Sequence, residues 1–267
     1  MENKAIGIFD SGVGGLTVLK EVERLLPNED IIYFGDTARV PYGNKSKSTI
    51  IKFSTENILF LLKKKVKIIV IACNTASSLA LDSLKDIFSV PLIGVVEAGA
   101  AKALKVSKNR KIAVVGTRST INSKSYEKAI LKNDKTAKIY SKACPLFVPL
   151  VEEGILEGVI AKSIIEMYLK SFKSAHTDVI ILGCTHYPLL KRQIAAYLKG
   201  VYIVDSATEV ALHARGVLMQ HNLLRSKNNK TGKREFYVTD EPKAFMRHAG
   251  LFLKRKIPLP KVINNLQ

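Results

Sequence analysis

Short apolar runs alternate along the chain with longer segments in which apolar residues recur every three or four positions. The runs at residues 5–9, 31–34 and 67–72 have the length of buried strands. The segment at residues 16–26 places its leucines and valines on one helical face and stops at Pro27. This alternation predicts an α/β protein with a mostly parallel sheet.

The pattern continues through the first third of the chain. After a loop at residues 41–43 we expect a helix at residues 50–61, a second helix at residues 79–88 and a strand at residues 91–96. Each predicted strand is followed by polar or small residues, so the strand ends are marked as well as the strands.

The C-terminal quarter has a pattern of its own. Ser206 and Glu209 have the spacing of a capping box, which predicts a helix that starts there and runs to about Leu224. The polar residues 225–234 predict a surface loop. This tail has no counterpart before residue 112, and we expect it to pack back on the first half of the chain.

The middle of the chain repeats the beginning. The matched segments are residues 6–11 with 112–117, 68–74 with 179–185, and 92–97 with 201–205. The repeat aligns Cys184 with Cys73 and Thr117 with Ser11. Three matched strand ends in one order indicate an internal duplication.

The repeat predicts two similar Rossmann-like α/β domains with mostly parallel sheets, related by internal duplication, with the active site in the cleft between them. We expect the first domain to comprise residues 1–97 plus 207–267 and the second to comprise residues 98–206. The length of 267 residues suits two such domains.

Charge is the most unusual feature of the composition. Lys and Arg number 42 against 23 Asp and Glu, which gives a net charge of +19. The excess suggests nucleic acid, but the basic residues are spread along the chain, and 32 of them are Lys whereas base reading favours Arg. A solvated surface is the preferred interpretation, and we expect no nucleic-acid partner.

Targeting signals and disulfides are not predicted. No apolar stretch approaches the ~20 residues that a membrane helix needs, and the N-terminus lacks a signal-peptide core, so no membrane association is expected. Cys73, Cys144 and Cys184 are an odd, widely spaced set that predicts free thiols in the cytoplasm. Cys144 lies outside the repeat and is interpreted as structural.

Cys73 and Cys184 are the strongest candidates for chemistry, since each follows an apolar strand. Ligands bind at the carboxyl ends of strands in open α/β sheets. If the two halves face each other, the two sulfurs flank one ligand. Removing a proton from one face of a carbon and returning it to the other face requires two acid–base groups on opposite sides, which predicts racemisation or epimerisation.

Acid–base partners lie on the same edges. Asp10 ends the first strand, and His186 follows Cys184 by two residues. Asp10 could instead cap a helix, and His186 could instead join the two cysteines in a zinc site, although the paired ligand spacing of structural zinc is absent. No metal is expected. The glycine-rich residues 10–15 lack the third glycine of a dinucleotide fingerprint and predict a turn that approaches a small anion.

Four segments together resemble the signature segments of the bacterial glutamate racemases, in the family's order. They are residues 10–16 (DSGVGGL), 41–43 (PYG), 73–77 (CNTAS) and 183–189 (GCTHYPL). The resemblance extends from Ile6 to about Ala214. It implies a cofactor-independent enzyme that interconverts L- and D-glutamate and supplies D-glutamate for peptidoglycan.

The resemblance also implies roles for particular residues. Cys73 would deprotonate D-glutamate with help from Asp10, and Cys184 would deprotonate L-glutamate with help from His186. Glu152 matches a further family acid. The residues implied around the substrate are Asp10, Ser11, Tyr42, Gly43, Asn74, Thr75, Thr185 and His186, with Thr117 and Thr120 as additional contacts. Family members are commonly homodimers, and we expect one here.

Two alternatives stay open. A racemase of another small acid such as aspartate would share the paired thiols. A basic protein with a secondary nucleic-acid or gyrase-binding activity would explain the charge, although the chain has no Trp for base stacking. Some family members need a cell-wall precursor that binds an N-terminal extension. Only five residues precede Ile6, so we expect activity without this activator.

Overall fold

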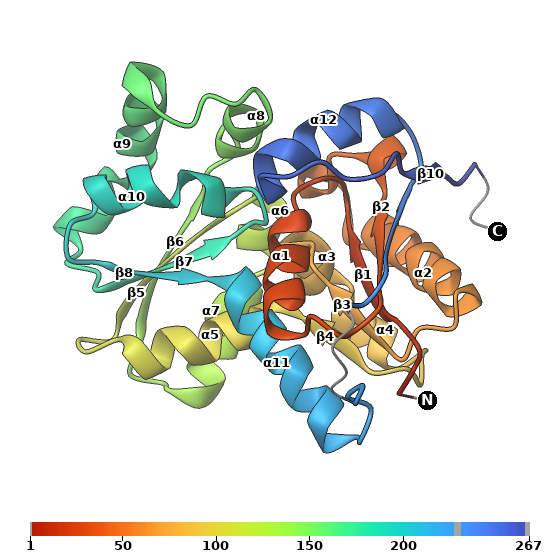
Figure 1. Ribbon diagram of the computed structural model, residues 1–267. Coiled ribbons are helices and arrows are strands. Elements are labelled where there is room, and N and C mark those ends of the chain that lie inside the picture. The colour runs from red at the N-terminus through yellow and green to blue at the C-terminus, as the bar shows by residue number, and fades with distance from the viewer. Residues whose placement is uncertain (1, 227–230, 265–267) are drawn as a thin grey trace.

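The computed structural model describes residues 2–226 and 231–264 and contains two parallel β-sheets (Figure 1). The first sheet has the strand order β10-β9-β2-β1-β3-β4, and the second has the order β6-β5-β7-β8. Every strand pair is parallel. The predicted α/β class with two similar halves is therefore confirmed.

The strands of the first sheet are β1 (Ile6–Asp10), β2 (Ile31–Gly35), β3 (Ile68–Ile71), β4 (Leu92–Gly94), β9 (Arg234–Val238) and β10 (Lys261–Val262). Those of the second are β5 (Lys111–Gly116), β6 (Lys138–Ala143), β7 (Val179–Gly183) and β8 (Tyr202–Asp205). The C-terminal segment thus joins the first sheet, because β9 pairs with β2 from Ile31↔Arg234 to Gly35↔Val238.

The longer helices are α1 (Leu16–Leu25), α2 (Lys47–Lys63), α5 (Val95–Val106), α7 (Ser125–Asn133), α9 (Gly158–Ser174), α11 (Ser206–Gln220) and α12 (Pro242–Leu253). Shorter ones are α3 (Asn74–Leu79), α4 (Leu81–Lys85), α6 (Arg118–Asn122), α8 (Phe147–Glu152) and α10 (Lys191–Tyr197), with 3-10 turns at Thr37–Arg39, Tyr42–Asn44 and Tyr187–Leu190. No helix in the described ranges has the length and apolar character to cross a bilayer.

The strand orders of the two sheets bear out the internal repeat. The series β2-β1-β3-β4 corresponds to β6-β5-β7-β8, so that β3 and β7 hold equivalent places. Cys73 follows β3 after one residue and Cys184 follows β7 directly. The two thiols therefore lie at equivalent strand ends.

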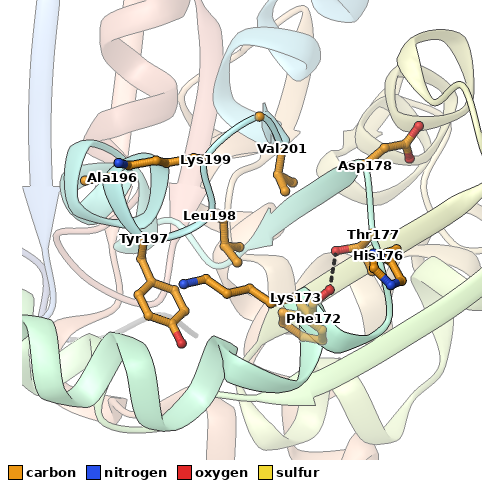
Figure 2. Close-up of a pocket in the computed structure, with 11 residues that line it drawn as sticks. Phe172, Lys173, His176, Thr177, Asp178, Ala196, Tyr197, Leu198, Lys199 and Val201 are labelled. Atoms are coloured by element: carbon orange, nitrogen blue, oxygen red, sulfur yellow. Dashed lines mark hydrogen bonds between the residues drawn. The ribbon is translucent and has the colours of Figure 1, made fainter.

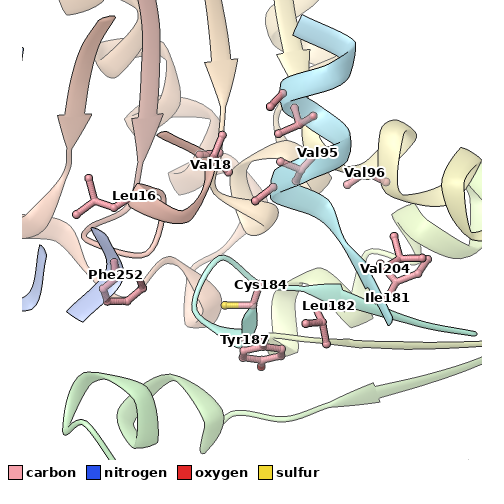
Figure 3. Close-up of a cluster of buried hydrophobic side chains, with 14 of the residues drawn as sticks. Leu16, Val18, Val95, Val96, Ile181, Leu182, Cys184, Tyr187, Val204 and Phe252 are labelled. Atoms are coloured by element: carbon pink, nitrogen blue, oxygen red, sulfur yellow. The ribbon is translucent and has the colours of Figure 1, made fainter. Parts of the chain in front are cut away.

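One apolar core runs from the first half into the second. Alternate residues of β3 face opposite sides of the sheet, with Ile69 and Ile71 toward α2 to α4 and Ile68 and Val70 toward the other half. Helix α11 contacts both α1 and α5, and Figure 1 shows α1 and α11 between the two sheets. Figure 3 shows Cys184 among buried side chains that α1, α5 and α12 contribute.

Two local predictions are wrong. The strand expected at residues 91–96 ends at Gly94, because Val95 and Val96 already belong to α5. The helix expected at residues 79–88 is interrupted at Ala80, and α4 ends at Lys85. In both places apolar residues continue past the boundary, so hydrophobicity alone did not mark it.

The predicted helix cap is also wrong. Asp205, not Ser206, is the N-cap of α11, and its carboxylate accepts a hydrogen bond from the backbone N–H of Ala207. The Ser206 hydroxyl donates instead to the carbonyl of Leu182. The helix ends at Gln220, before the expected Leu224. Part of the surface loop predicted at residues 225–234 lies outside the described residues, and Arg234 is the first residue of β9.

Candidate active site

A cavity of about 410 Å³ lies between the two halves and has both cysteines in its wall. Its other walls come from the turn after β1, the loop after β2 and the segments after β5, β6 and β7. The predicted residues that line it are Ser11, Tyr42, Gly43, Cys73, Asn74, Thr75, Thr117, Glu152, Cys184, Thr185 and His186. One cavity therefore joins segments that are far apart in the sequence.

On the Cys73 side of the cavity, the ionisable neighbour of the sulfur is the carboxyl group of Asp10. The Cys73 thiol lies 3.7 Å from the Ser11 hydroxyl, and burial together with the nearby Asp10 carboxylate raises the pKa of Cys73 to about 12. Asp10 is fully buried beneath the cavity, where its Oδ2 accepts a hydrogen bond from the Gly12 N–H and its Oδ1 has no partner. Burial raises the pKa of this carboxyl.

Asp10 does not cap a helix. The N-cap of α1 is Gly15, and no side chain bonds to its N-terminus. Asp10 instead accepts a hydrogen bond from the turn that borders the cavity.

The Cys184 side is a chain of three ionisable groups. The sulfur lies 3.9 Å from His186 Nδ1, and His186 Nε2 lies 2.9 Å from Glu152 Oε1. Burial lowers the pKa of His186, but the interactions with Cys184 and Glu152 outweigh it and raise this pKa to about 10. The hydrogen bond with His186 in turn lowers the pKa of Glu152. At neutral pH an imidazolium held by a carboxylate therefore faces Cys184.

This arrangement differs from a zinc site. Within residues 2–226 and 231–264, no group of three or more His, Cys, Asp or Glu side chains is arranged to hold a metal ion. His186 instead uses both ring nitrogens, one toward sulfur and one toward a carboxylate. The geometry suits proton transfer and charge stabilisation.

Two glycines of the turn after β1 lie in close contacts, Gly14 with the opposite half and Gly15 with its own half. A Cβ atom at Gly14 would lie 2.3 Å from Thr185 Oγ1 and 2.5 Å from His186 Nδ1, and one at Gly15 would lie 2.5 Å from the Asp10 Cβ. The Thr17 hydroxyl bonds across to the Thr185 carbonyl at 3.1 Å. The glycine-rich turn is therefore an inter-half contact, and its small residues are required by close approach.

The loop that carries Tyr42 and Gly43 is fixed by a buried carboxylate. Asp36 is fully buried and accepts hydrogen bonds from Arg39 and from the Tyr42 hydroxyl. The Thr239 hydroxyl of the C-terminal segment also donates to Asp36, at 3.1 Å. Asp36 therefore ties Arg39, Tyr42 and Thr239 together and holds the Tyr42 hydroxyl in place beside the cavity.

Threonine hydroxyls form another part of the wall. Thr75 Oγ1 lies 2.9 Å from Thr117 Oγ1, and Thr120 Oγ1 lies 3.0 Å from Thr117 Oγ1. Thr117 is the N-cap of α6 and lines the cavity, whereas Thr120 is buried behind it. Uncharged donors of this kind can hold a carboxylate without adding a competing base.

Sequence analysis missed several residues around the cavity. Gly12, Val40, Pro41, Asn44, Arg118, Pro145, Val148 and Pro149 also line it. Phe252 of α12 packs its ring edge-on against His186 with centroids 5.5 Å apart. Gly12 and Pro41 lie inside segments that the sequence had already marked, but nothing local connects Phe252 to His186.

Cys144 has a structural environment. It is fully buried, its thiol lies 3.6 Å from the Lys142 carbonyl, and its own carbonyl accepts a hydrogen bond from Tyr187. Burial raises the pKa of this thiol. It does not line the cavity.

A second hollow of about 600 Å³ lies at the amino ends of β7 and β8 and contains none of the predicted site residues (Figure 2). The Lys173 ammonium lies 3.6 Å from the centroid of the Tyr197 ring there. Asp178 accepts hydrogen bonds from Ser107 and from the Lys108 and Asn109 N–H groups. Lys173 and Asp178 therefore already have partners within the fold.

Comparison with known proteins identifies the family of this chain. The Asp/Glu/Hydantoin racemase family model matches residues 6–214. A glutamate racemase of Aquifex aeolicus is 48% identical over 98% of each chain. The chain belongs to the glutamate racemase family.

Solved structures agree with this membership. The crystal structure of glutamate racemase from Francisella tularensis in complex with D-glutamate is 39% identical, covers 100% of this chain and 99% of that one, and gives a TM-score of 0.93. An aspartate racemase homologue from Pyrococcus horikoshii is 20% identical, covers 81% of this chain and 99% of that one, and gives a TM-score of 0.60. This second likeness shows a shared fold.

Proposed function

We propose that this protein is a cofactor-independent glutamate racemase in which Cys73 and Cys184 are the two bases that exchange the proton at Cα. The observation that carries the proposal is that thiols from equivalent ends of β3 and β7 line one cavity. A single base could remove and return a proton on one face only, whereas inversion needs an acid and a base on opposite faces.

The proton moves in two steps. The thiolate of Cys184 takes the Cα proton of L-glutamate, and the electron pair of the broken bond is delocalised into the α-carboxylate. The thiol of Cys73 then gives its proton to the other face. The reverse reaction exchanges the two roles, so each turnover leaves the opposite sulfur protonated.

The surroundings of the two sulfurs suit these starting states. The raised pKa of Cys73 keeps it a thiol in the empty site, ready to donate. The imidazolium of His186, held by Glu152, stabilises negative charge on Cys184. Asp10 lies next to Cys73 and is placed to assist its proton transfers.

We assign substrate binding to Ser11, Tyr42, Gly43, Asn74, Thr75, Thr185 and His186, with Asp10 beneath them. The cavity wall formed by these residues offers hydroxyl, amide and backbone donors rather than lysines. Such donors would bind both carboxylates of glutamate without diverting the proton.

The wider assignments follow from the same function. D-glutamate made here would supply peptidoglycan. The three cysteines are free, and thiol catalysis is best protected in a reducing compartment, which favours the cytoplasm. The homodimer, the division at residues 97/98 and 206/207, and activity without a cell-wall precursor stay predictions.

Solvent deuterium exchange at Cα tests the mechanism. We expect Cys73→Ser and Cys184→Ser each to lose at least about 1,000-fold in racemisation, since each removes one acid–base group. Cys73→Ser should still exchange the Cα proton of L-glutamate alone, and Cys184→Ser that of D-glutamate alone. Cys144→Ser is the matched control and should keep its racemase activity.

Two results would overturn the proposal. One is wild-type protein that exchanges no Cα proton of either glutamate enantiomer. The other is exchange of both enantiomers by a single-cysteine variant, which would mean that one base reaches both faces. Faster turnover of L-aspartate than of L-glutamate would instead favour the aspartate alternative.

A further inference from the structure

Tyr126 lies between the two strand ends that carry the cysteines. It is the second residue of α7, and only 2% of its surface is exposed. A Cβ atom at Gly183 would lie 3.1 Å from its Cε2, and one at Gly99 would lie 3.3 Å from its Cε1. The ring thus occupies a slot bordered by two glycines, one of which directly precedes Cys184.

The hydroxyl of Tyr126 reaches the other strand end. It donates a hydrogen bond of 2.7 Å to Oδ1 of Asn74, which directly follows Cys73 and lines the cavity. It also lies 3.1 Å from the Ser206 hydroxyl, which donates to the Leu182 carbonyl of β7. One side chain is therefore bonded to the Cys73 strand end and packed against the Cys184 strand end.

The bond to Tyr126 decides which end of the Asn74 amide meets the cavity. Since Oδ1 accepts from the tyrosine, the Nδ2 group remains available as a donor, and Asn74 lines the cavity. An asparagine without this partner can turn its amide over and present oxygen, which repels a carboxylate. The orientation of Asn74 is thus set by a residue of the other half of the molecule.

We propose that Tyr126 is a positioning residue that fixes Asn74 with its Nδ2 toward a substrate carboxylate. The proposal rests on the racemase function stated above and extends it to a residue outside the cavity wall. Tyr126 touches no substrate itself. Its effect passes through Asn74.

The test compares Tyr126→Phe with wild type in both directions of racemisation. The variant keeps the ring in its slot and loses only the hydroxyl. We expect KM for L- and D-glutamate to rise about 10-fold while kcat changes less than about 3-fold, because a substrate hydrogen bond is weakened. In an Asn74→Ala background the same change should raise KM by less than about 2-fold.

Tyr237→Phe is the matched control, since it removes a buried tyrosine hydroxyl that bonds to Glu235, away from the cavity. It should leave KM unchanged. Ser206→Ala supports the proposal if KM stays within about 3-fold of wild type, because the bond between Tyr126 and Asn74 remains.

Three results would overturn the proposal. The first is an unchanged KM in Tyr126→Phe, and the second is a fall in kcat alone. The third is a KM effect as large in Ser206→Ala as in Tyr126→Phe. Wild-type protein without racemase activity would refute the proposed function instead, so the two failures are distinguishable.

Discussion

The two sides of the cavity start from equivalent strand ends and differ in what surrounds the sulfur. Cys73 is buried near Asp10, and burial raises the pKa of both groups, so the thiol form of Cys73 is favoured. Cys184 faces His186, whose pKa is raised to about 10 and whose charge is balanced by Glu152. The two matched strand ends each carry a thiol, and the groups that surround the two sulfurs differ in charge.

The difference has a chemical use. With identical surroundings neither sulfur would be set apart as the acid or as the base. In the proposed mechanism the raised pKa of Cys73 makes it the acid, and His186 lies beside Cys184 to stabilise negative charge there. The protein therefore keeps the repeat in its strands and departs from it in the side chains next to each sulfur.

Among substitutions that leave both cysteines in place, one that forces the turn after β1 away from His186 should have the largest effect. Gly14→Ala would place a Cβ atom 2.3 Å from Thr185 Oγ1 and 2.5 Å from His186 Nδ1, so the turn or the histidine must shift. We expect kcat/KM to fall by about 100-fold, as for an ångström-scale misplacement of a catalytic group.

Gly12→Ala is the control for that substitution in the same turn. Its Cβ atom would meet only the Val40 Cγ1 atom at 3.3 Å, a side chain that is half exposed and can move. Steady-state kinetics should show a loss at least 10-fold smaller. Equal losses in the two variants would mean that the approach of Gly14 to His186 is unimportant.

Removing the carboxylate of Glu152 that bonds to His186 should slow proton transfer at Cys184 and not at Cys73. Glu152→Gln takes away the carboxylate that raises the pKa of His186, and we expect kcat/KM to fall about 10-fold. The enantiomers have equal free energies, so this fall must be the same in both directions. The direction shows instead in the isotope effect with Cα-deuterated substrate, which should rise for L-glutamate and shrink for D-glutamate.

Glu153→Gln is the matched control, because Glu153 is the exposed neighbour that does not line the cavity. It should leave rates and isotope effects unchanged. An isotope effect that changes equally for both enantiomers in Glu152→Gln would contradict the assignment of Glu152 to the Cys184 side.

The same pair should make stability depend on pH. The folded pKa of His186 is about 10 against an ordinary value of 6.5, so its contribution is fully present below pH 6.5 and is lost as pH rises through 10. Because 43% of the Glu152 side chain is exposed, we expect about 1 kcal/mol between wild type and Glu152→Gln near pH 6.

Urea unfolding of both proteins at several pH values measures this difference. It should shrink steadily between pH 6.5 and 10. A difference that grows over this range would have the wrong sign and would refute the ion pair.

The smallest effect is expected where the C-terminal tail supports the site. Phe252→Leu keeps most of the buried volume but loses the edge-on ring contact with His186. We expect kcat/KM to fall about 3-fold, measured beside Phe245→Leu, which alters a buried ring of the same helix that contacts Tyr33 instead. Equal losses would point to a general effect of α12.

Much of this protein could be predicted from local sequence. Apolar runs marked β1, β2, β3, β5, β7 and β8, and the repeat placed Cys73 and Cys184 at matching ends. These features are local because strand and helix period are written in consecutive residues. Boundaries failed where apolar residues continued past the end of an element, as at Val95.

Tertiary structure alone decided which side chains meet. Asp205 caps α11 because Ser206 is taken by the Leu182 carbonyl, and Phe252 reaches His186 because the C-terminal strand β9 joins the first sheet beside β2. The orientation of Asn74 depends on a tyrosine 52 positions away. Such pairs are set by strand order and helix docking, for which nearby residues carry no signal, whereas the repeat in the sequence already placed the two thiols at matching strand ends.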